Sequence, residues 1–423
     1  MHFSRILLTV GGLILAAPVL AAPAQIELSH QLDEERAARF EPLIERFNGQ
    51  QKDVQIKLVR RVEGDAPKQL NLVTREEHSR FLANKAKFKP IGEVMREAKQ
   101  TLDASKLAPE LRFGVTDAKG QLLALPLAYS TPVLFINKAA FRKAGLNPDM
   151  PPKTWAEAQE AAGKLVDAGS RCAYTTSWPA WVHIDNLSAW DGAPVADAKG
   201  NLEFNGLVQV KHVAMMATWA KSKYFTYFGR RDEADHRFAN GECGMLTSAS
   251  SLVAILGENK SLDYGVSSFP YHDDVRGAPQ STLADGSSLW VGGTVKPTEA
   301  KGVAAFVNYL LSPDLQVEMT VAGGFLPMSS AARAAMGSKL LKADLLGQNV
   351  AAAQLKGKMS PSVRVSQVEQ VRIIVEEELE NVWSNKKPSK EALDNAVQRG
   401  NAVMQPQPVA AKAKGKSKSK SSK

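Results

Sequence analysis

The chain has 423 residues, of which 44% are hydrophobic and 23% charged, an ordinary composition for a folded globular protein. Its net charge of +9 comes mainly from segment 412–423, which holds six lysines and no acidic residue. Without these lysines and Arg5 the net charge is about +2, which excludes a basic nucleic-acid-binding face. The length predicts two or more structural units.

The N-terminus is typical of a secretory signal peptide. Arg5 precedes an apolar run at residues 6–20, and small residues follow at Ala21, Ala22 and Ala24. The run is shorter than the roughly 20 residues that span a bilayer, so an uncleaved membrane anchor is the less favoured alternative. We expect residues 1–24 to be a signal peptide cleaved after Ala21 or Ala24, and the mature protein to lie in the periplasm.

The C-terminal segment 405–423 is rich in Pro, Gln, Lys and Ser. Such a segment has too little apolar surface to form a core, which predicts a disordered Lys-rich tail. We favour a solvated tail over one that is attracted to anionic cell-wall or membrane surfaces.

Two cysteines, Cys172 and Cys243, occur in the chain. In an oxidising compartment they can form a disulfide. Two buried thiols are equally compatible with the sequence, because spacing alone does not decide between these states.

Short apolar strands alternate with helical patterns along the body, which predicts an α/β fold. Strands are expected at residues 26–28, 54–62, 122–127 and 133–136. Between the first two, Phe40, Leu43, Ile44 and Phe47 recur at helical spacing. Pro42 interrupts this pattern, so we expect it in the first turn of the helix, where a missing N–H is tolerated.

The next helix has a clear start signal. Thr154-Trp155-Ala156-Glu157 is a capping box, in which the Thr and Glu side chains bond to free backbone N–H groups. Further helices are expected where apolar residues recur at helical spacing. They include 210–217, with stripe residues Val210, Val213, Ala214 and Ala217, and also 303–310, 368–383 and 389–403.

Nine short segments carry a family resemblance, for example Pro151-Pro152-Lys153-Thr154-Trp155. They are 134–138, 141–146, 151–155, 238–245, 130–134, 187–192, 210–215, 288–291 and 371–380. The first four resemble family-1 extracellular solute-binding proteins of ABC importers. The other five resemble the branch of that family that binds glycerol 3-phosphate.

The resemblance implies a type II periplasmic binding fold, in which two α/β lobes are joined by crossing hinge segments and enclose the ligand in a cleft. Ligand binding and lobe closure are then one equilibrium. The implied division gives the first lobe residues 25–132 and 276–330, the second lobe 133–275, and helices of the second lobe and hinge 331–404. The implied partners are a small polar ligand, of the glycerol-3-phosphate or glycerophosphodiester type, and an ABC permease, with the protein acting as a monomer.

Several residues match ligand contacts of the family. Arg372 matches a phosphate-contacting Arg, since a guanidinium offers paired donors to an anion. The alternative for this residue is a surface ion pair with Glu376, four residues further on. Ser130 matches a Ser contact, with a simple strand-end hydroxyl as its alternative, and Gly286 matches a Gly whose N–H faces the ligand.

Aromatic and hydroxyl contacts complete the implied site. Trp178 and Trp181 lie in a Pro-containing loop that suits an aromatic ligand wall, with core packing as the alternative. Ser248 and Ser250 straddle a second Ser contact. Phe325 stands where the family has a Tyr, which keeps the stacking face and loses the hydroxyl donor.

The first lobe departs from the family between residues 62 and 91, where this chain is shorter. Leu72-Val73-Thr74-Arg75 stands where the family has a Tyr-Glu pair that contacts ligand hydroxyls. An Arg cannot accept hydrogen bonds, so this half of the site is missing or rebuilt. Either the ligand differs, for example by carrying more negative charge to meet Arg75, or the protein binds weakly and has drifted to another role. For Arg75 itself we favour a solvated edge position.

An enzyme is not indicated. The sequence has no Gly-x-Ser-x-Gly, phosphate-loop or His/Cys metal motif, and His183 and His212 fit packed or surface positions. We therefore expect no catalytic residues, metal or cofactor. The rival to an importer component is a diverged periplasmic binding or scaffold protein that no longer binds glycerol 3-phosphate.

Overall fold

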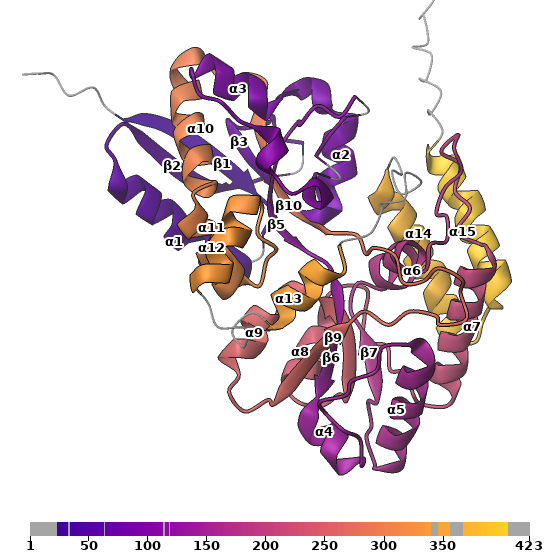
Figure 1. Ribbon diagram of the computed structural model, residues 1–423. Coiled ribbons are helices and arrows are strands. Elements are labelled where there is room, and N and C mark those ends of the chain that lie inside the picture. Colours follow the sequence, from indigo (N-terminus) through magenta and orange to yellow (C-terminus); the bar gives the residue numbers. More distant parts are fainter. Residues whose placement is uncertain are drawn as a thin grey trace, which may run out of the picture.

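The computed structural model describes residues 23–32, 34–62, 64–112, 115–117, 119–339, 346–355 and 367–404. The predicted Lys-rich tail and all but the last two residues of the predicted signal peptide lie outside these ranges. Ala24 is the first residue of strand β1, so of the two expected cleavage positions the one after Ala21 keeps this strand whole. The described residues form two α/β lobes, each built on its own sheet (Figure 1).

The first lobe contains a six-stranded sheet of order β2-β1-β3-β10-β4, with β5 also paired to β10. β1 (Ala24–His30) runs parallel to β2 (Val54–Arg60) and β3 (Leu70–Val73), and α1 provides the crossover between β1 and β2. β10 (Asp285–Gly292) returns antiparallel to β3, β4 (Phe88–Lys89) and β5 (Leu125–Ser130).

Helices cover the first sheet and bury its apolar residues, including Ile26 and Leu28, which are fully buried. α10 and α3 pack against each other beside the sheet (Figure 1). The helices of this lobe are α1 (Glu34–Gln50), α2 (His78–Ala83), α3 (Ile91–Glu97), α10 (Pro297–Leu310), α11 (Pro313–Gly323) and α12 (Ser330–Lys339), with short turns η1 (Arg75–Glu77), η2 (Lys85–Lys87), η3 (Ala104–Lys106) and η4 (Pro109–Leu111).

The second lobe contains a four-stranded sheet of order β7-β8-β6-β9. Its strands are β6 (Pro132–Asn137), β7 (Tyr174–Thr176), β8 (Met245–Ala249) and β9 (Tyr264–Ser268). Its helices are α4 (Lys138–Lys143), α5 (Trp155–Asp167), η5 (Trp181–Asn186), α6 (Leu187–Asp191), α7 (Leu207–Lys221), α8 (Glu233–Ala239), η6 (Ser250–Leu252), α9 (Val253–Glu258), α13 (Leu346–Ala353), α14 (Val368–Trp383) and α15 (Ser389–Met404).

The chain crosses between the sheets at Thr131, which links β5 to β6, and again between β9 and β10. The two crossings are fastened together, because Thr131 Oγ1 donates to Thr282 Oγ1 at 2.7 Å. Gln354 also holds them, accepting from the backbone N–H of Thr282 and donating to the carbonyl of Pro132. The segment boundaries implied by the resemblance remain a prediction, although these crossings lie beside two of them.

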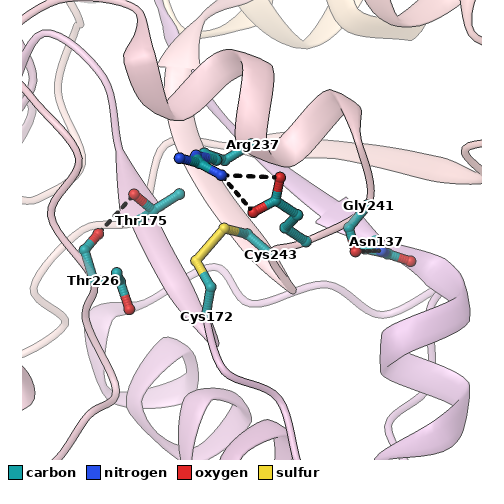
Figure 2. The surroundings of a disulfide bond; sticks show 8 residues. Asn137, Cys172, Thr175, Thr226, Arg237, Gly241 and Cys243 are labelled. Atoms are coloured by element: carbon teal, nitrogen blue, oxygen red, sulfur yellow. Dashed lines mark hydrogen bonds and ion pairs between the residues drawn. A yellow bond between two sulfur atoms is a disulfide. The ribbon is translucent and has the colours of Figure 1, made fainter.

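A disulfide joins Cys172 to Cys243 at the entries to β7 and β8, which are parallel neighbours (Figure 2). The sequence alone was equally compatible with a disulfide and with two free thiols, and the structure shows the disulfide. In the part of the chain that the structure describes, no helix is long and apolar enough to cross a membrane.

Several helices begin and end where the sequence predicted. The capping box at Thr154 and Glu157 is confirmed, and the last two helices match the expected ranges. The prediction that Pro42 lies in the first turn of its helix is wrong, because α1 begins at Glu34 and Pro42 lies inside it. The apolar face of α1, with Phe40, Ile44 and Phe47 buried, packs on the sheet and outweighs the hydrogen bond lost at Pro42.

Two further details differ from expectation. The strand expected at 122–127 begins three residues later, because Leu122 instead pairs with Thr116 in an isolated bridge. On α7 the buried stripe includes His212, Val213 and Trp219, whereas Ala214 is exposed.

Candidate ligand-binding site

Arg372 lies where the two lobes meet. Its Nε donates to Asp185 Oδ2 at 2.8 Å and its Nη1 donates to Asp285 Oδ2 at 3.1 Å. Asp185 belongs to the second lobe and Asp285 is the first residue of β10 in the first lobe. The alternative pairing of Arg372 with Glu376 is not formed, since Glu376 pairs with Arg231 at 3.8 Å. The side chain of Arg372 is 12% exposed, so it is an interface residue and not a surface one.

The pKa values of the two carboxyl groups beside Arg372 are shifted in opposite directions. Burial by itself would raise the pKa of Asp285, but the charges of Arg372 and Arg75 lower this pKa below its ordinary value. Burial raises the pKa of Asp185 above its ordinary value, and the nearby Arg372 offsets this only in part. Asp285 is therefore the firmly ionised partner of the guanidinium.

Arg75 also lies inside the interface, and the expected solvated edge position is wrong. Its guanidinium carbon is 3.8 Å from the ring centroid of Trp181 and 5.3 Å from that of Trp178, both in the second lobe. Its Nε is 3.5 Å from Asp285 Oδ2, and its side chain is only 11% exposed. Packing of a planar cation on an indole face explains why a charged residue is buried here.

The two tryptophans are fixed by their backbone. Trp178 has a φ of +55°, a left-handed conformation that is uncommon outside glycine. Its N–H donates to the carbonyl of Arg231 at 3.0 Å, which holds this conformation. Its half-buried ring lies near both Arg75 and Arg231, whose guanidinium carbons are 5.3 Å and 5.6 Å from its centroid. Trp181 is 2% exposed and begins the π-helical turn η5.

Ser130 and Gly286 lie on neighbouring hinge strands. Ser130 ends β5 and is in register with Asp285, beside Gly286 on β10. A Cβ at position 286 would lie 1.9 Å from the carbonyl oxygen of Ala128, so the close approach of β5 requires glycine there. The N–H of Gly286 donates to Asp285 Oδ1 at 2.8 Å, so it is engaged in the ligand-free protein.

Three further predicted residues lie in β8, in the hinge and after α11. Ser248 is in β8 beside the buried Asp235, whose pKa is raised to about 6 by burial, although the hydroxyl of Ser177 donates to Asp235 Oδ1 at 2.7 Å. Ser250 accepts a hydrogen bond from the N–H of Thr131 in the hinge. Phe325 is half-buried at the end of α11 and makes no ring contact with the described residues.

Sequence reasoning missed four polar residues of the interface. They are His78, Asp185, Arg231 and Asp285. His78 is fully buried, which lowers its pKa and keeps it neutral, and its Nε2 is 2.7 Å from Ser288 Oγ. Asp185 could have been found, since it follows Trp181 by four residues on a helical face. Asp285 gives no such signal, because a carboxylate is unexpected beside an Arg that is predicted to bind phosphate.

A separate hollow of about 810 Å³ opens on the second lobe, lined by residues that include Phe225, Tyr227 and Trp383. None of the predicted site residues lines it. The candidate ligand site is the lobe interface, where charged and aromatic groups from both lobes converge. Among the described residues, no cluster of His, Cys, Asp or Glu could hold a metal ion.

Two α/β lobes, tied by crossing segments and meeting at a polar and aromatic interface, define a solute-binding protein of the periplasmic type. The chain belongs to the bacterial extracellular solute-binding protein family, which it matches over residues 39–346. It is a non-enzymatic periplasmic binding protein of an ABC importer system, and this class has a small-molecule ligand and a membrane permease as partners.

Curated relatives support this membership. The sn-glycerol-3-phosphate-binding periplasmic protein UgpB of Pectobacterium atrosepticum is 37% identical over 410 residues, covering 91% of this chain and 92% of that protein. The protein of the same name from Salmonella typhimurium is 39% identical over 337 residues, covering 77% of each.

Solved structures confirm the fold. UgpB from Mycobacterium tuberculosis in complex with glycerophosphocholine has a TM-score of 0.75 at 19% identity, covering 90% of this chain and 98% of that one. A solute-binding protein from Thermotoga lettingae bound with α-D-tagatose has a TM-score of 0.74 at 19% identity, covering 91% and 100%. Because proteins of this fold bind such different ligands, the fold does not identify the ligand of this chain.

Proposed function

We propose that this protein captures glycerol 3-phosphate, or a closely related glycerophosphodiester, in the periplasm and delivers it as a monomer to an ABC permease. The observation that carries the proposal is Arg372, a buried guanidinium that faces both lobes. Relatives that are named for sn-glycerol 3-phosphate share 37–39% identity with the chain, which supports the same ligand class.

Arg372 has a further hydrogen-bond donor that a phosphate could use. Its Nε and Nη1 are used by Asp185 and Asp285, and Nη2 makes no hydrogen bond with the described residues. A phosphate at Nη2 would gain a charge-assisted bond, and a shift of Asp285 would release Nη1 for a second one. Because Asp285 and Arg372 belong to different lobes, this exchange would couple ligand binding to lobe closure.

The other predicted residues complete the proposed site. Ser130, Ser248, Ser250 and the N–H of Gly286 are the proposed donors to the ligand. Trp178 and Trp181 form the proposed wall, and Phe325 is a proposed apolar contact. Ser248 and Ser250 flank the end of β8 that meets the hinge, in the same lobe as Arg372.

A thermal-melt screen of the mature protein tests the proposal. We expect sn-glycerol 3-phosphate at one hundred times its Kd to raise Tm by about 5 °C, because such saturation adds about 2.7 kcal/mol. Glycerol, inorganic phosphate and maltose are the controls and should give little shift. A rise with maltose alone would instead indicate a carbohydrate ligand.

The second candidate, a binding or scaffold protein without this ligand, rests on one observation. Asp285 pairs with both Arg372 and Arg75, and Asp185 also pairs with Arg372, so each of these guanidinium groups has a carboxylate partner within the protein. X-ray scattering distinguishes the two functions. Compaction on adding sn-glycerol 3-phosphate supports an importer component, and an unchanged radius of gyration with every ligand of the screen supports the scaffold.

A further inference from the structure

The aromatic wall of the site already holds cations that belong to the protein. Arg75 lies over Trp181, with the guanidinium carbon 3.8 Å from the ring centroid, and near Trp178 at 5.3 Å. Arg231 lies 5.6 Å from the centroid of Trp178. An indole face is the preferred binding surface for a quaternary ammonium group, and here that surface is occupied.

We propose that Arg75 is a specificity-determining residue, which makes the site select glycerol phosphates whose second group is uncharged or anionic and reject those that carry a quaternary ammonium. This inference rests on the proposed function, since it concerns the same site. A quaternary ammonium would have to displace the guanidinium from Trp181 or lie beside it, and the two positive charges would repel each other in a poorly solvated interface.

Arg75 is held firmly enough to impose this preference. Its Nε is 3.5 Å from Asp285, and the turn η1 that it begins is fixed by Glu77, which accepts from the N–H of Thr74 at 3.1 Å. Glu77 is in turn paired with Arg61 at 2.5 Å and with Arg80 at 2.8 Å. A guanidinium anchored in this way cannot swing aside without breaking buried contacts.

The groups around Arg75 favour a ligand hydroxyl or anion. Arg231 and Arg372 add two positive charges near Arg75, and burial lowers the pKa of His78 and keeps it neutral. A guanidinium only donates hydrogen bonds, so the ligand group that meets Arg75 must accept them. Hydroxyl, carboxylate and phosphate oxygens do so, and a trimethylammonium group does not.

Two diesters give a matched comparison. Glycerophosphoglycerol and glycerophosphocholine each carry one negative phosphodiester group. The second group is an uncharged diol in glycerophosphoglycerol and a quaternary ammonium in glycerophosphocholine. Calorimetric titration of the mature protein should show glycerophosphoglycerol bound at least about tenfold more tightly. In Arg75→Gln the difference should shrink to within about threefold, through tighter binding of glycerophosphocholine. Arg75→Lys keeps the charge and should keep the preference.

Arg237→Gln is the control variant, because Arg237 lies over the ring of Phe228 at 5.3 Å and pairs with Glu242 beside the disulfide, away from the site (Figure 2). It should leave the ratio unchanged. Wild-type binding of glycerophosphocholine as tight as that of glycerophosphoglycerol, or an unchanged ratio in Arg75→Gln, would overturn the inference alone. No binding of either diester or of sn-glycerol 3-phosphate would overturn the proposed function, and the inference with it.

Discussion

Arg372 and Asp285 form an ion pair of 3.1 Å between a helix of the second lobe and a strand of the first. Asp285 is also 3.5 Å from Arg75, so one carboxylate bridges two buried guanidinium groups. This carboxylate therefore links charged groups of both lobes at their interface. A phosphate that binds Arg372 competes with Asp285 for the same donors, which makes this carboxylate central to both stability and affinity.

Asp285→Asn should destabilise the ligand-free protein by about 3 kcal/mol, because it leaves buried positive charge less compensated. Urea unfolding without ligand measures this loss. The matched control is Glu318→Gln, which breaks an exposed pair with Arg46 in the first lobe and should cost about 1 kcal/mol or less. Equal stability of Asp285→Asn and the wild type would show that the ion pair does not hold the lobes together.

Glu376 should make stability depend on pH. Burial raises its pKa from the ordinary 4.5 to about 7, although Arg231 opposes the shift, and its Oε2 has no hydrogen-bond partner among the described residues. A raised folded-state pKa means that the contribution to stability is fully present below pH 4.5 and is lost as the pH rises to about 7. Glu376→Gln should therefore be more stable than the wild type by about 1–3 kcal/mol at pH 8.

This gain should disappear near pH 4.5, where both side chains are neutral. Urea unfolding of the two proteins at both pH values isolates Glu376, because the other titrating groups are common to them. A difference that is the same at pH 4.5 and pH 8 would contradict the assignment.

The disulfide should stabilise the second lobe without affecting the ligand. Cys172 and Cys243 are 71 residues apart, and closing a loop of this length stabilises the fold by about 4 kcal/mol in the chain-entropy description. The double variant Cys172→Ala/Cys243→Ala should lose about 2–4 kcal/mol of unfolding free energy. Calorimetry should show an unchanged affinity for sn-glycerol 3-phosphate, and a large loss of affinity would place the disulfide in the binding mechanism.

Local sequence signals predicted the elements of the fold well. The capping box at Thr154 and Glu157 is formed by side chains close in sequence, so it could be predicted from local sequence alone. The strands expected at 26–28 and 133–136 lie within the longer strands β1 and β6. Pro42 shows the limit of local rules. Burial of Phe40 and Ile44 against the sheet kept the helix intact around a residue that usually ends one.

The site was predicted only in part. Arg372 was predicted from its match to a family position, and Trp178 and Trp181 from their place in a Pro-containing loop; the structure places all three at the lobe interface, and their roles toward a ligand remain predictions. The burial of Arg75 could not be predicted, since its partners Trp181 and Asp285 are more than one hundred residues away and belong to tertiary structure. For the same reason the sequence did not reveal that Asp285 pairs with both arginines.

Calorimetric titration of the mature protein with sn-glycerol 3-phosphate, compared with Arg372→Lys, tests the central claim most directly. Arg372→Lys keeps the charge beside Asp185 and Asp285 but loses the paired donors of the guanidinium. We predict a wild-type Kd near or below about 10 μM, roughly −7 kcal/mol, and a Kd at least about thirtyfold weaker in the variant. Absence of binding heat with the wild type, or equal affinity in the two proteins, would contradict the account.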